Sequence, residues 1–192
     1  RLKHMNIIVK TYGSKSCYCR PDTTWERENK DFYAPECVTS LNWSPIIFVR
    51  ISKAGKCISD RFASRYYDAF NYGALLYCHT EDASDLASAS CFDHTSLLPA
   101  PLYNLIVMEN EDNVHEVMKN GEPIFRTSGT ISGKEMIEEA ICLASRKTSL
   151  RIGDYIAVEL APQSLLASRA EGEIRIDARF CENSLYSMKL IF

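Results

Sequence analysis

Long apolar runs are missing from this sequence of 192 residues. Runs such as residues 45–49 and 155–158 are far shorter than the roughly 20 residues with which a helix crosses a bilayer, so we expect no membrane-spanning helix. A secretory signal is missing too, because the apolar stretch near residues 5–9 is very short and polar residues follow it directly. We therefore expect a cytoplasmic protein without a membrane partner. Met5 is a candidate natural start, which makes residues 1–4 candidate upstream or tag sequence.

Charge is not concentrated along the sequence either. The net charge is only −3, and the basic residues are scattered rather than clustered. Because proteins that bind nucleic acids carry a basic cluster or stripe, we expect no nucleic-acid partner. Glycine and proline are few, at 8 and 7 residues, and 46% of the residues are hydrophobic, which indicates an ordinary globular protein. The length predicts a single domain over residues 1–192.

The eight cysteines lack the spacing of zinc ligands. Cys17 and Cys19 are the only close pair, and neither a second pair nor a nearby histidine completes a tetrahedral site. In a protein without a secretory signal, such cysteines indicate free thiols in a reducing compartment rather than disulfides.

Short segments with strand patterns are what the chain has in abundance. Polar and apolar residues alternate at 173–180, and β-branched or apolar runs predict further strands at 5–10, 44–51, 74–78 and 155–160. Asn120 and Gly121 predict a turn, residues 11–30 a loop, and residues 80–90 a mobile loop or short helix.

Two helices are predicted between these strands. One begins after Ser59, carries apolar residues at spacings of three and four up to Phe70, and ends near Gly73 as a left-handed cap. The other covers residues 133–145. Because strands outnumber helices, the sequence predicts a β-rich α+β fold.

Five segments resemble one family in the same order along the chain. In residues 48–68, a strand ending in Val49-Arg50-Ile51 leads through a turn with lysine and glycine to Tyr66-Tyr67-Asp68. Shorter matches are residues 91–93 and 150–156, and weaker ones are 5–8 and 120–122. Together these segments resemble the fumarylacetoacetate hydrolase family, and they run through most of the chain.

The resemblance implies a fold like the C-terminal domain of that family, a mixed β-roll of layered sheets with a few short helices, and a homodimer. It also implies Mg²⁺, Mn²⁺ or Ca²⁺ as cofactor and acylpyruvates or other 2-oxo acids as substrates, cleaved at a carbon–carbon bond or decarboxylated. A hard divalent cation needs oxygen ligands, and it would stabilise the enolate that forms.

The residues at the positions of the metal ligands do not match the family. Its two glutamates fall on Ser44 and Ile46, and its aspartate falls on Thr80. A serine hydroxyl is a weak neutral ligand and isoleucine offers none. The family's lysine falls on Ser90, its T-G-T-P turn on residues 159–162, and its amino-terminal histidine has no counterpart in residues 10–17.

Three hypotheses follow from these substitutions, and the third is a purely structural subunit that pairs with an active paralogue. The first is a catalytically inactive homologue without a metal or other cofactor, in which a vestigial pocket at Ser44, Ile46, Thr80 and Ser90 binds a small molecule or the fold serves protein association. The second is a hydrolase or lyase of 2-oxo acids with a rebuilt site. The candidate residues for that rebuilt site are His79, Glu81, Asp82, Cys91 and Asp93.

Overall fold

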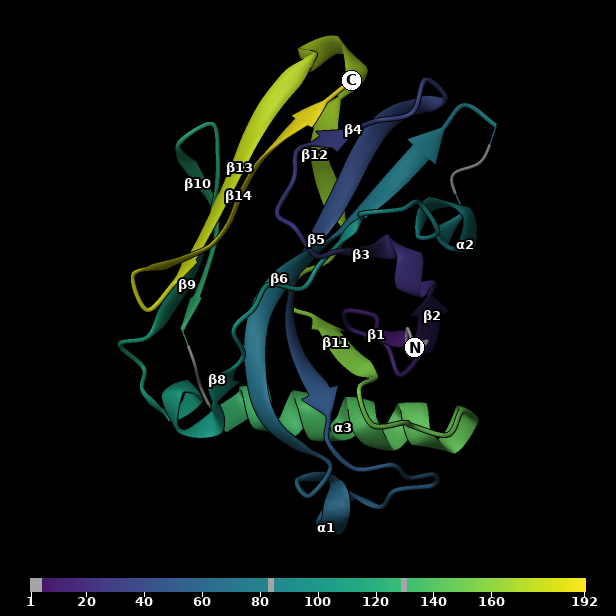
Figure 1. Ribbon diagram of the computed structural model, residues 1–192, viewed down its shortest axis with the longest axis vertical. Helices are drawn as coiled ribbons and strands as arrows, with labels where there is room; N and C mark the ends of the chain where they lie inside the picture. The colour runs from purple at the N-terminus through teal and green to yellow at the C-terminus, as the bar shows by residue number, and fades with distance from the viewer. Residues whose placement is uncertain (1–4, 83–84, 129–130) are drawn as a thin grey trace.

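Two β-sheets form most of this fold (Figure 1), which a computed structural model describes for residues 5–82, 85–128 and 131–192. Residues 1–4, the candidate upstream segment, lie outside that description. The β-rich α+β class predicted from the sequence is confirmed. Among the described residues, the larger sheet has nine strands, in the order β2 (Cys17–Arg20), β1 (Ile7–Lys10), β11 (Tyr155–Glu159), β5 (Val38–Ile51), β6 (Tyr67–Thr80), β7 (Ser96–Leu97) and β3 (Trp25–Glu26), with β12 (Ser164–Ser168) paired to β5 and β8 (Tyr103–Asn104) paired to β6.

The smaller sheet has five strands among the described residues. The hairpin of its first two strands turns at Asn120 and Gly121, as predicted, and both residues have positive φ. The strand predicted at 173–180 is present with the same bounds. The order is β10 (Glu122–Ser128), β9 (Val114–Lys119), β13 (Glu173–Phe180), β14 (Asn183–Ile191) and β4 (Phe32–Tyr33).

One long helix and several short ones complete the fold. The long helix α3 (Ile131–Lys147) confirms the prediction at 133–145, and its buried residues Ile137, Ala140 and Ile141 lie on the face that packs against the larger sheet. Spacings of three and four place these residues on one side of the helix. The short helices are α1 (Asp60–Ala63), α2 (Leu86–Ala89) and the 3₁₀ turns η1 (Asp22–Thr24), η2 (Leu105–Glu109) and η3 (Arg169–Glu171).

The prediction of a helix from Ser59 to about Phe70 is wrong beyond the first helical turn. Helix α1 ends at Ala63, and the aromatic residues from Tyr67 onward belong to β6, which pairs with β5 along almost its whole length. Pairing with a strand distant in sequence outweighs the helical spacing of the aromatic residues. Gly73 is therefore not a helix cap but a strand residue, and a Cβ there would lie 2.1 Å from the carbonyl oxygen of Leu97.

The loop predicted at residues 11–30 is also partly wrong. This segment contains β2, which pairs with β1, and β3, which pairs in parallel with β7. Both strands are very short, so local sequence carries little signal for them and long-range pairing decides their structure.

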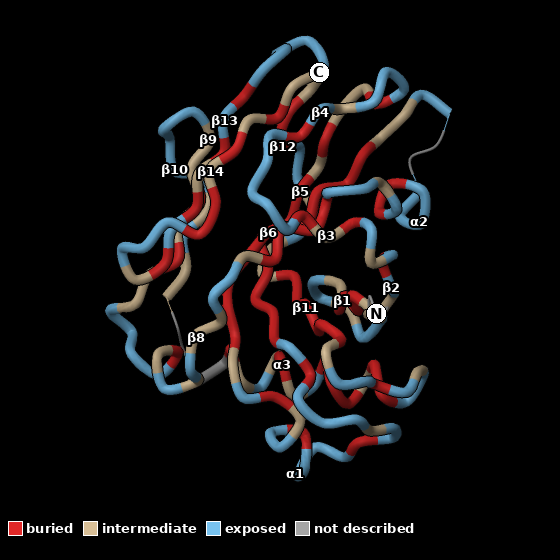
Figure 2. The backbone as a smooth tube through the Cα atoms, viewed as in Figure 1, coloured by how far each residue is buried: buried red, intermediate tan, exposed pale blue. Residues whose placement is uncertain are grey.

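Strands β5 and β6 are buried along most of their length (Figure 2), and their two faces border separate parts of the core. Ile47 and Val49 point toward the smaller sheet and α3, in the larger apolar cluster. Ile46 and Phe48 point the opposite way, into a second cluster with Ile7, Val9 and Tyr155. Because side chains alternate along a strand, Ser44 points to the same face as Ile46. Two of the predicted vestigial pocket positions therefore lie at the second cluster.

Candidate functional site

Ser44 and Ile46 lie in the interior of the larger sheet. Both side chains are completely buried. The Ser44 hydroxyl donates a hydrogen bond to the carbonyl oxygen of Ala161, at 2.8 Å. Ile46 packs in the second apolar cluster with Phe48 and Leu75. At these two positions the structure therefore places close packing.

A buried polar network lies on the same face. The Tyr77 hydroxyl donates to the carboxylate of Glu159, the strand partner of Ile46, and is 2.8 Å from the Tyr18 hydroxyl. The other Glu159 oxygen accepts from the backbone N–H of Tyr12 at 2.9 Å. Burial raises the pKa of Tyr18 to about 12 and raises that of Tyr77 still further, so both phenols stay protonated at neutral pH.

Arg20 is buried beside this network, and no carboxylate among the described residues forms an ion pair with it. Its guanidinium donates to the carbonyl oxygens of Leu76 at 2.7 Å and Ser90 at 3.0 Å, and to the Thr95 hydroxyl at 2.8 Å. It also lies 5.1 Å from the centre of the Tyr77 ring. Desolvation lowers the pKa of Arg20, but the carbonyl oxygens and the ring face stabilise its charge.

Thr80 and Ser90, the other two predicted vestigial positions, lie at the end of β6 and after α2. Ser90 is buried, and its hydroxyl donates to the carbonyl oxygen of Ala87 at 3.1 Å. Thr80 is half-buried on β6. Ser90 thus joins the surroundings of Arg20 through its backbone, while its side chain closes the turn that follows α2.

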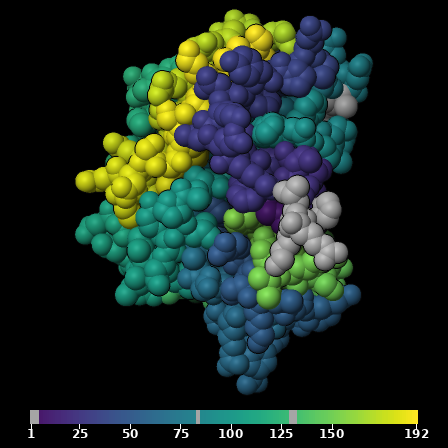
Figure 3. All heavy atoms as spheres, viewed as in Figure 1, coloured from purple at the N-terminus to yellow at the C-terminus, as the bar shows by residue number. Residues whose placement is uncertain are grey.

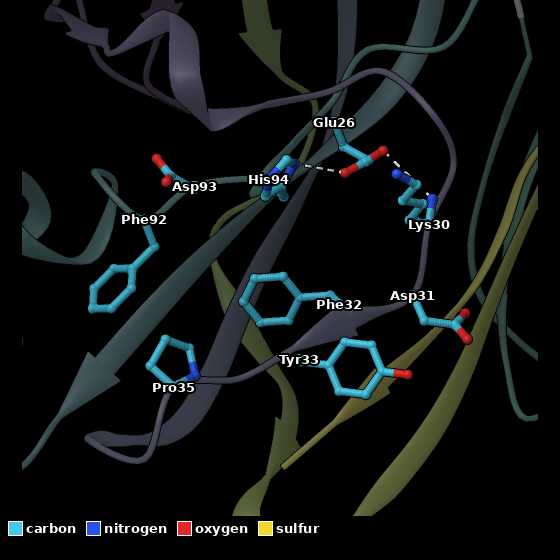
Figure 4. A pocket seen from close by; sticks show the side chains of 9 residues that line it. All are labelled: Glu26, Lys30, Asp31, Phe32, Tyr33, Pro35, Phe92, Asp93 and His94. Carbon is cyan, nitrogen blue, oxygen red and sulfur yellow. Dashed lines mark hydrogen bonds and ion pairs between the residues drawn. The ribbon is translucent and has the colours of Figure 1, made fainter.

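The five rebuilt-site candidates are not gathered in one place. His79 is half-buried on β6, whereas Glu81 and Asp82 are exposed just after it. The Cys91 thiol is exposed and donates to the carbonyl oxygen of Ala87 at 3.0 Å. Asp93 alone of the five lines the open pocket shown in Figure 4.

That pocket, of about 610 Å³, lies between β3, β4 and the segment that follows α2. Aromatic side chains form its lower part in Figure 4, and most of the charged or polar ones lie above them, except Asp31, which lies beside Tyr33. Its lining residues are Glu26, Lys30, Asp31, Phe32, Tyr33, Pro35, Phe92, Asp93 and His94. A second pocket shares Glu26, Lys30, Asp93 and His94 with it and extends toward Trp25.

A close contact between the Glu26 carboxylate and the His94 ring sets the polar side of the pocket. Oε2 of Glu26 is 2.8 Å from Nδ1 of His94, and Oε1 accepts the backbone N–H of Glu28 at 2.7 Å. The Glu26 side chain is 6% exposed, but that of His94 is 62% exposed, so a fixed carboxylate orients an accessible imidazole. The backbone of His94 has positive φ, and its backbone N–H donates to the carbonyl oxygen of Thr23 at 3.3 Å.

The sequence predicted neither Glu26 nor His94 as a site residue. They lie on segments far apart in the chain, which the parallel pairing of β3 with β7 and the backbone hydrogen bond from His94 to Thr23 bring together. No motif of local spacing contains both.

Solved structures decide what fold this arrangement belongs to. The chain is similar to the fumarylpyruvate hydrolase of Pseudomonas aeruginosa, solved with Mn²⁺ and pyruvate, with a TM-score of 0.74 and 14% identity over 99% of this chain and 90% of that one. The chain has the fold of the fumarylacetoacetate hydrolase family. A protein of that family from Yersinia pestis gives a TM-score of 0.74 at 14% identity, covering 98% of this chain and 93% of that chain.

An isomerase shares the fold as well. The 5-carboxymethyl-2-hydroxymuconate delta-isomerase of Mycobacterium smegmatis gives a TM-score of 0.74 at 11% identity, over 98% of this chain and 79% of that one. The sequence itself matches no protein-family model and no curated protein. Identities this low show the fumarylacetoacetate hydrolase fold alone.

The residues at the expected ligand positions do not fit a divalent metal. Ser44 contributes a neutral hydroxyl whose hydrogen is already donated to Ala161, and Ile46 contributes packed methyl groups. The carboxylate of Glu159, the strand partner of Ile46, is engaged by Tyr77 and by the backbone N–H of Tyr12. Mg²⁺ and Mn²⁺ prefer several oxygen ligands, including carboxylates, around one open space.

Proposed function

We propose that this protein is a catalytically inactive relative of the fumarylacetoacetate hydrolases that binds a small molecule in the pocket beside Glu26 and His94. The observation that carries the proposal is the close packing at Ser44 and Ile46, which face a hydrogen-bonded backbone carbonyl and an apolar cluster. A metal-dependent reaction would need carboxylates and space there. The pocket beside Glu26 and His94, in contrast, is open and has both an apolar wall and polar groups.

The charges of the pocket favour a neutral or cationic ligand over a 2-oxo acid anion. Three carboxylates line it, on Glu26, Asp31 and Asp93, against the ammonium of Lys30 and the imidazole of His94. Lys30 is itself paired with Glu28, which reduces its attraction for a ligand anion. The rings of Phe32, Tyr33 and Phe92 suit a flat apolar body, so the expected ligand is a small aromatic or aliphatic ring compound with an amino group.

Metal dependence is tested directly with Mn²⁺. We expect no saturable Mn²⁺ binding to the protein by calorimetry and no Mn²⁺-dependent cleavage of fumarylpyruvate. Mn²⁺-stimulated turnover that disappears in Ser44→Ala would overturn the proposal, because that hydroxyl would then be a ligand rather than part of the packing.

Ile46→Glu provides a second test at the same position. The carboxylate would be buried in the second apolar cluster, so we expect a destabilisation of about 3–5 kcal/mol in urea unfolding and no gain of Mn²⁺ affinity. Ile46→Val is the matched control and should cost about 1 kcal/mol. A stable Ile46→Glu variant that binds Mn²⁺ would show that position 46 borders an accessible space.

Ligand binding is tested by screening small ring compounds by nuclear magnetic resonance, with amines and carboxylates of matched size. We expect amines to bind more tightly, and Phe92→Ala or Glu26→Gln to weaken them about tenfold. Leu165→Ala serves as a control, since that side chain is exposed on β12 and does not line the pocket. A preference for carboxylates, or binding that ignores both pocket variants, would contradict this ligand assignment.

The Glu26–His94 pair favours one alternative, an enzyme with a rebuilt site that acts on acylpyruvate-like or other 2-oxo acid substrates. A buried carboxylate that orients an accessible imidazole is the arrangement of a general base. Asp93 lies in the same pocket and is the one predicted rebuilt-site residue there. Turnover without added metal, lost in His94→Gln and kept in Cys91→Ser, would favour this alternative over the inactive relative.

A further inference from the structure

The fold gathers basic residues that are scattered along the sequence at one end of the molecule. Residues 52–66 project from the body as a narrow tip, and residues 145–153 lie against them (Figures 1 and 3). Gly55 and Leu150 exchange two backbone hydrogen bonds, and the N–H of Cys57 donates to the carbonyl oxygen of Ser145 at 2.9 Å. We call these two segments the basic tip.

The charge of the basic tip is opposite to that of the remaining protein. The tip has seven basic residues and a single acidic one, Asp60, which gives a charge of +6. The rest of the chain keeps 15 basic and 24 acidic residues, a charge of −9, in agreement with −3 overall. The basic residues are all exposed, and they are Lys53, Lys56, Arg61, Arg65, Arg146, Lys147 and Arg151.

None of these seven cations is neutralised by the residues that the structure describes. Across residues 5–82, 85–128 and 131–192, no ion pair joins any of them to a carboxylate. Exposed like charges held together by the backbone repel one another, and an anionic surface relieves that repulsion. The tip is thus complementary to a negatively charged partner.

Exposed apolar residues lie among the cations. Phe62, in the short helix at the end of the tip, is 37% exposed, and Ile152 on the neighbouring segment is 61% exposed. The guanidinium carbons of Arg61 and Arg65 lie 4.9 and 5.0 Å from the centre of the Phe62 ring. Similarly, Nζ of Lys53 lies 5.4 Å from the centre of the Tyr66 ring.

This arrangement suits a lipid surface better than a nucleic acid. Proteins bind single-stranded nucleic acids by stacking bases on aromatic faces in a groove, but here the cations already lie over the rings of Phe62 and Tyr66. A projecting tip that combines cations with exposed apolar residues can instead reach headgroup phosphates and insert its apolar edge between them. We infer that, against the expectation from the sequence of no membrane partner, the basic tip docks the protein on membranes that contain anionic phospholipids.

Sedimentation with lipid vesicles tests this inference. We expect the full chain to bind vesicles with about 30% phosphatidylserine, not to bind pure phosphatidylcholine, and to dissociate at about 0.5 M salt. Removing one basic side chain should lower the partition coefficient about fivefold. The double variant Arg61→Gln/Arg65→Gln should therefore lower it about 25-fold, and Phe62→Ala should lower it severalfold.

Matched controls separate the tip from total charge. Lys15→Gln/Arg126→Gln changes the net charge equally at exposed positions outside the tip, and it should leave vesicle binding nearly unchanged. If the Arg61/Arg65 variant fails to fold by circular dichroism, Lys53→Gln/Lys56→Gln replaces it, with the same expected loss. Equal losses in tip and control variants, or equal binding to both vesicle types, would refute the inference. So would displacement from vesicles by an RNA oligonucleotide or an acidic peptide that binds the tip more tightly.

Discussion

His115 should make the stability of this protein fall on mild acidification. It lies on β9 and is fully buried, with its ring stacked on Tyr72 at a centroid distance of 4.6 Å. Nδ1 is 3.0 Å from the carbonyl oxygen of Arg179, to which it donates as the neutral imidazole. Burial lowers the pKa of His115 from 6.5 to about 4.

The sign and size of the effect follow from proton binding. Between about pH 6.5 and 4 the unfolded chain binds a proton at His115 and the folded chain does not, so the stability present at neutral pH is lost as the pH falls. At pH 4.5 the loss due to this residue is about 2.5 kcal/mol, since one pKa unit corresponds to about 1.4 kcal/mol.

Urea unfolding of wild type and His115→Phe, followed by tryptophan fluorescence at pH 7.5 and 4.5, measures this loss. Phenylalanine keeps the ring stacking on Tyr72 but does not titrate, so the fall in unfolding free energy should be about 2.5 kcal/mol smaller in the variant. The variant also loses the hydrogen bond of Nδ1, which lowers its free energy of unfolding by about 1 kcal/mol. Because this loss is the same at both pH values, it cancels in the comparison. Parallel pH profiles for the two proteins would refute the reasoning.

Three further substitutions test the packing that surrounds the larger sheet. Gly73→Ala should destabilise the protein by about 3 kcal/mol or more in urea unfolding, since its Cβ would meet the Leu97 carbonyl oxygen at 2.1 Å; a neutral effect would mean that β7 shifts freely. Tyr77→Phe removes the hydroxyl that donates to buried Glu159, so a loss of about 2 kcal/mol in the same assay is expected, and an unchanged midpoint would argue against that hydrogen bond. Asp154→Ala should cost about 2–3 kcal/mol and speed amide exchange at Asn6, whose N–H it accepts at 2.8 Å; exchange as slow as in wild type would contradict this.

Segments with a strong local pattern were predictable from the sequence. The alternation at 173–180 and the turn at Asn120 and Gly121 depend on neighbouring residues only, and both are present in the structure. The aromatic residues from Tyr67 to Phe70 were not predictable in the same way. Their spacing suits a helical face, but the pairing of Val49 with Phe70 and of Ile51 with Tyr67 makes them part of a strand.

The candidate site was the least predictable part. The resemblance to the family predicted a vestigial pocket at Ser44 and Ile46, where the structure has closely packed side chains. The open pocket is instead lined by Glu26 and His94, which no rule of sequence spacing connects. The clustering of positive charge in the basic tip was not predictable from the sequence for a similar reason. Arg65 and Arg151 lie far apart in the sequence, but the backbone hydrogen bonds between Gly55 and Leu150 bring their two segments together.

The pairing of β1 with β11 has a consequence for synthesis on the ribosome. Ile7 lies beside Tyr155 in parallel register, and the N–H of Asn6 reaches a carboxylate oxygen 148 residues later in the chain. Strand β1 therefore cannot pair along its β11 side until residues 155–159 have been made. Such distant pairing slows folding. During that delay the unpaired edge of the apolar residues 7–9 is prone to aggregation, so we expect chaperones to bind it.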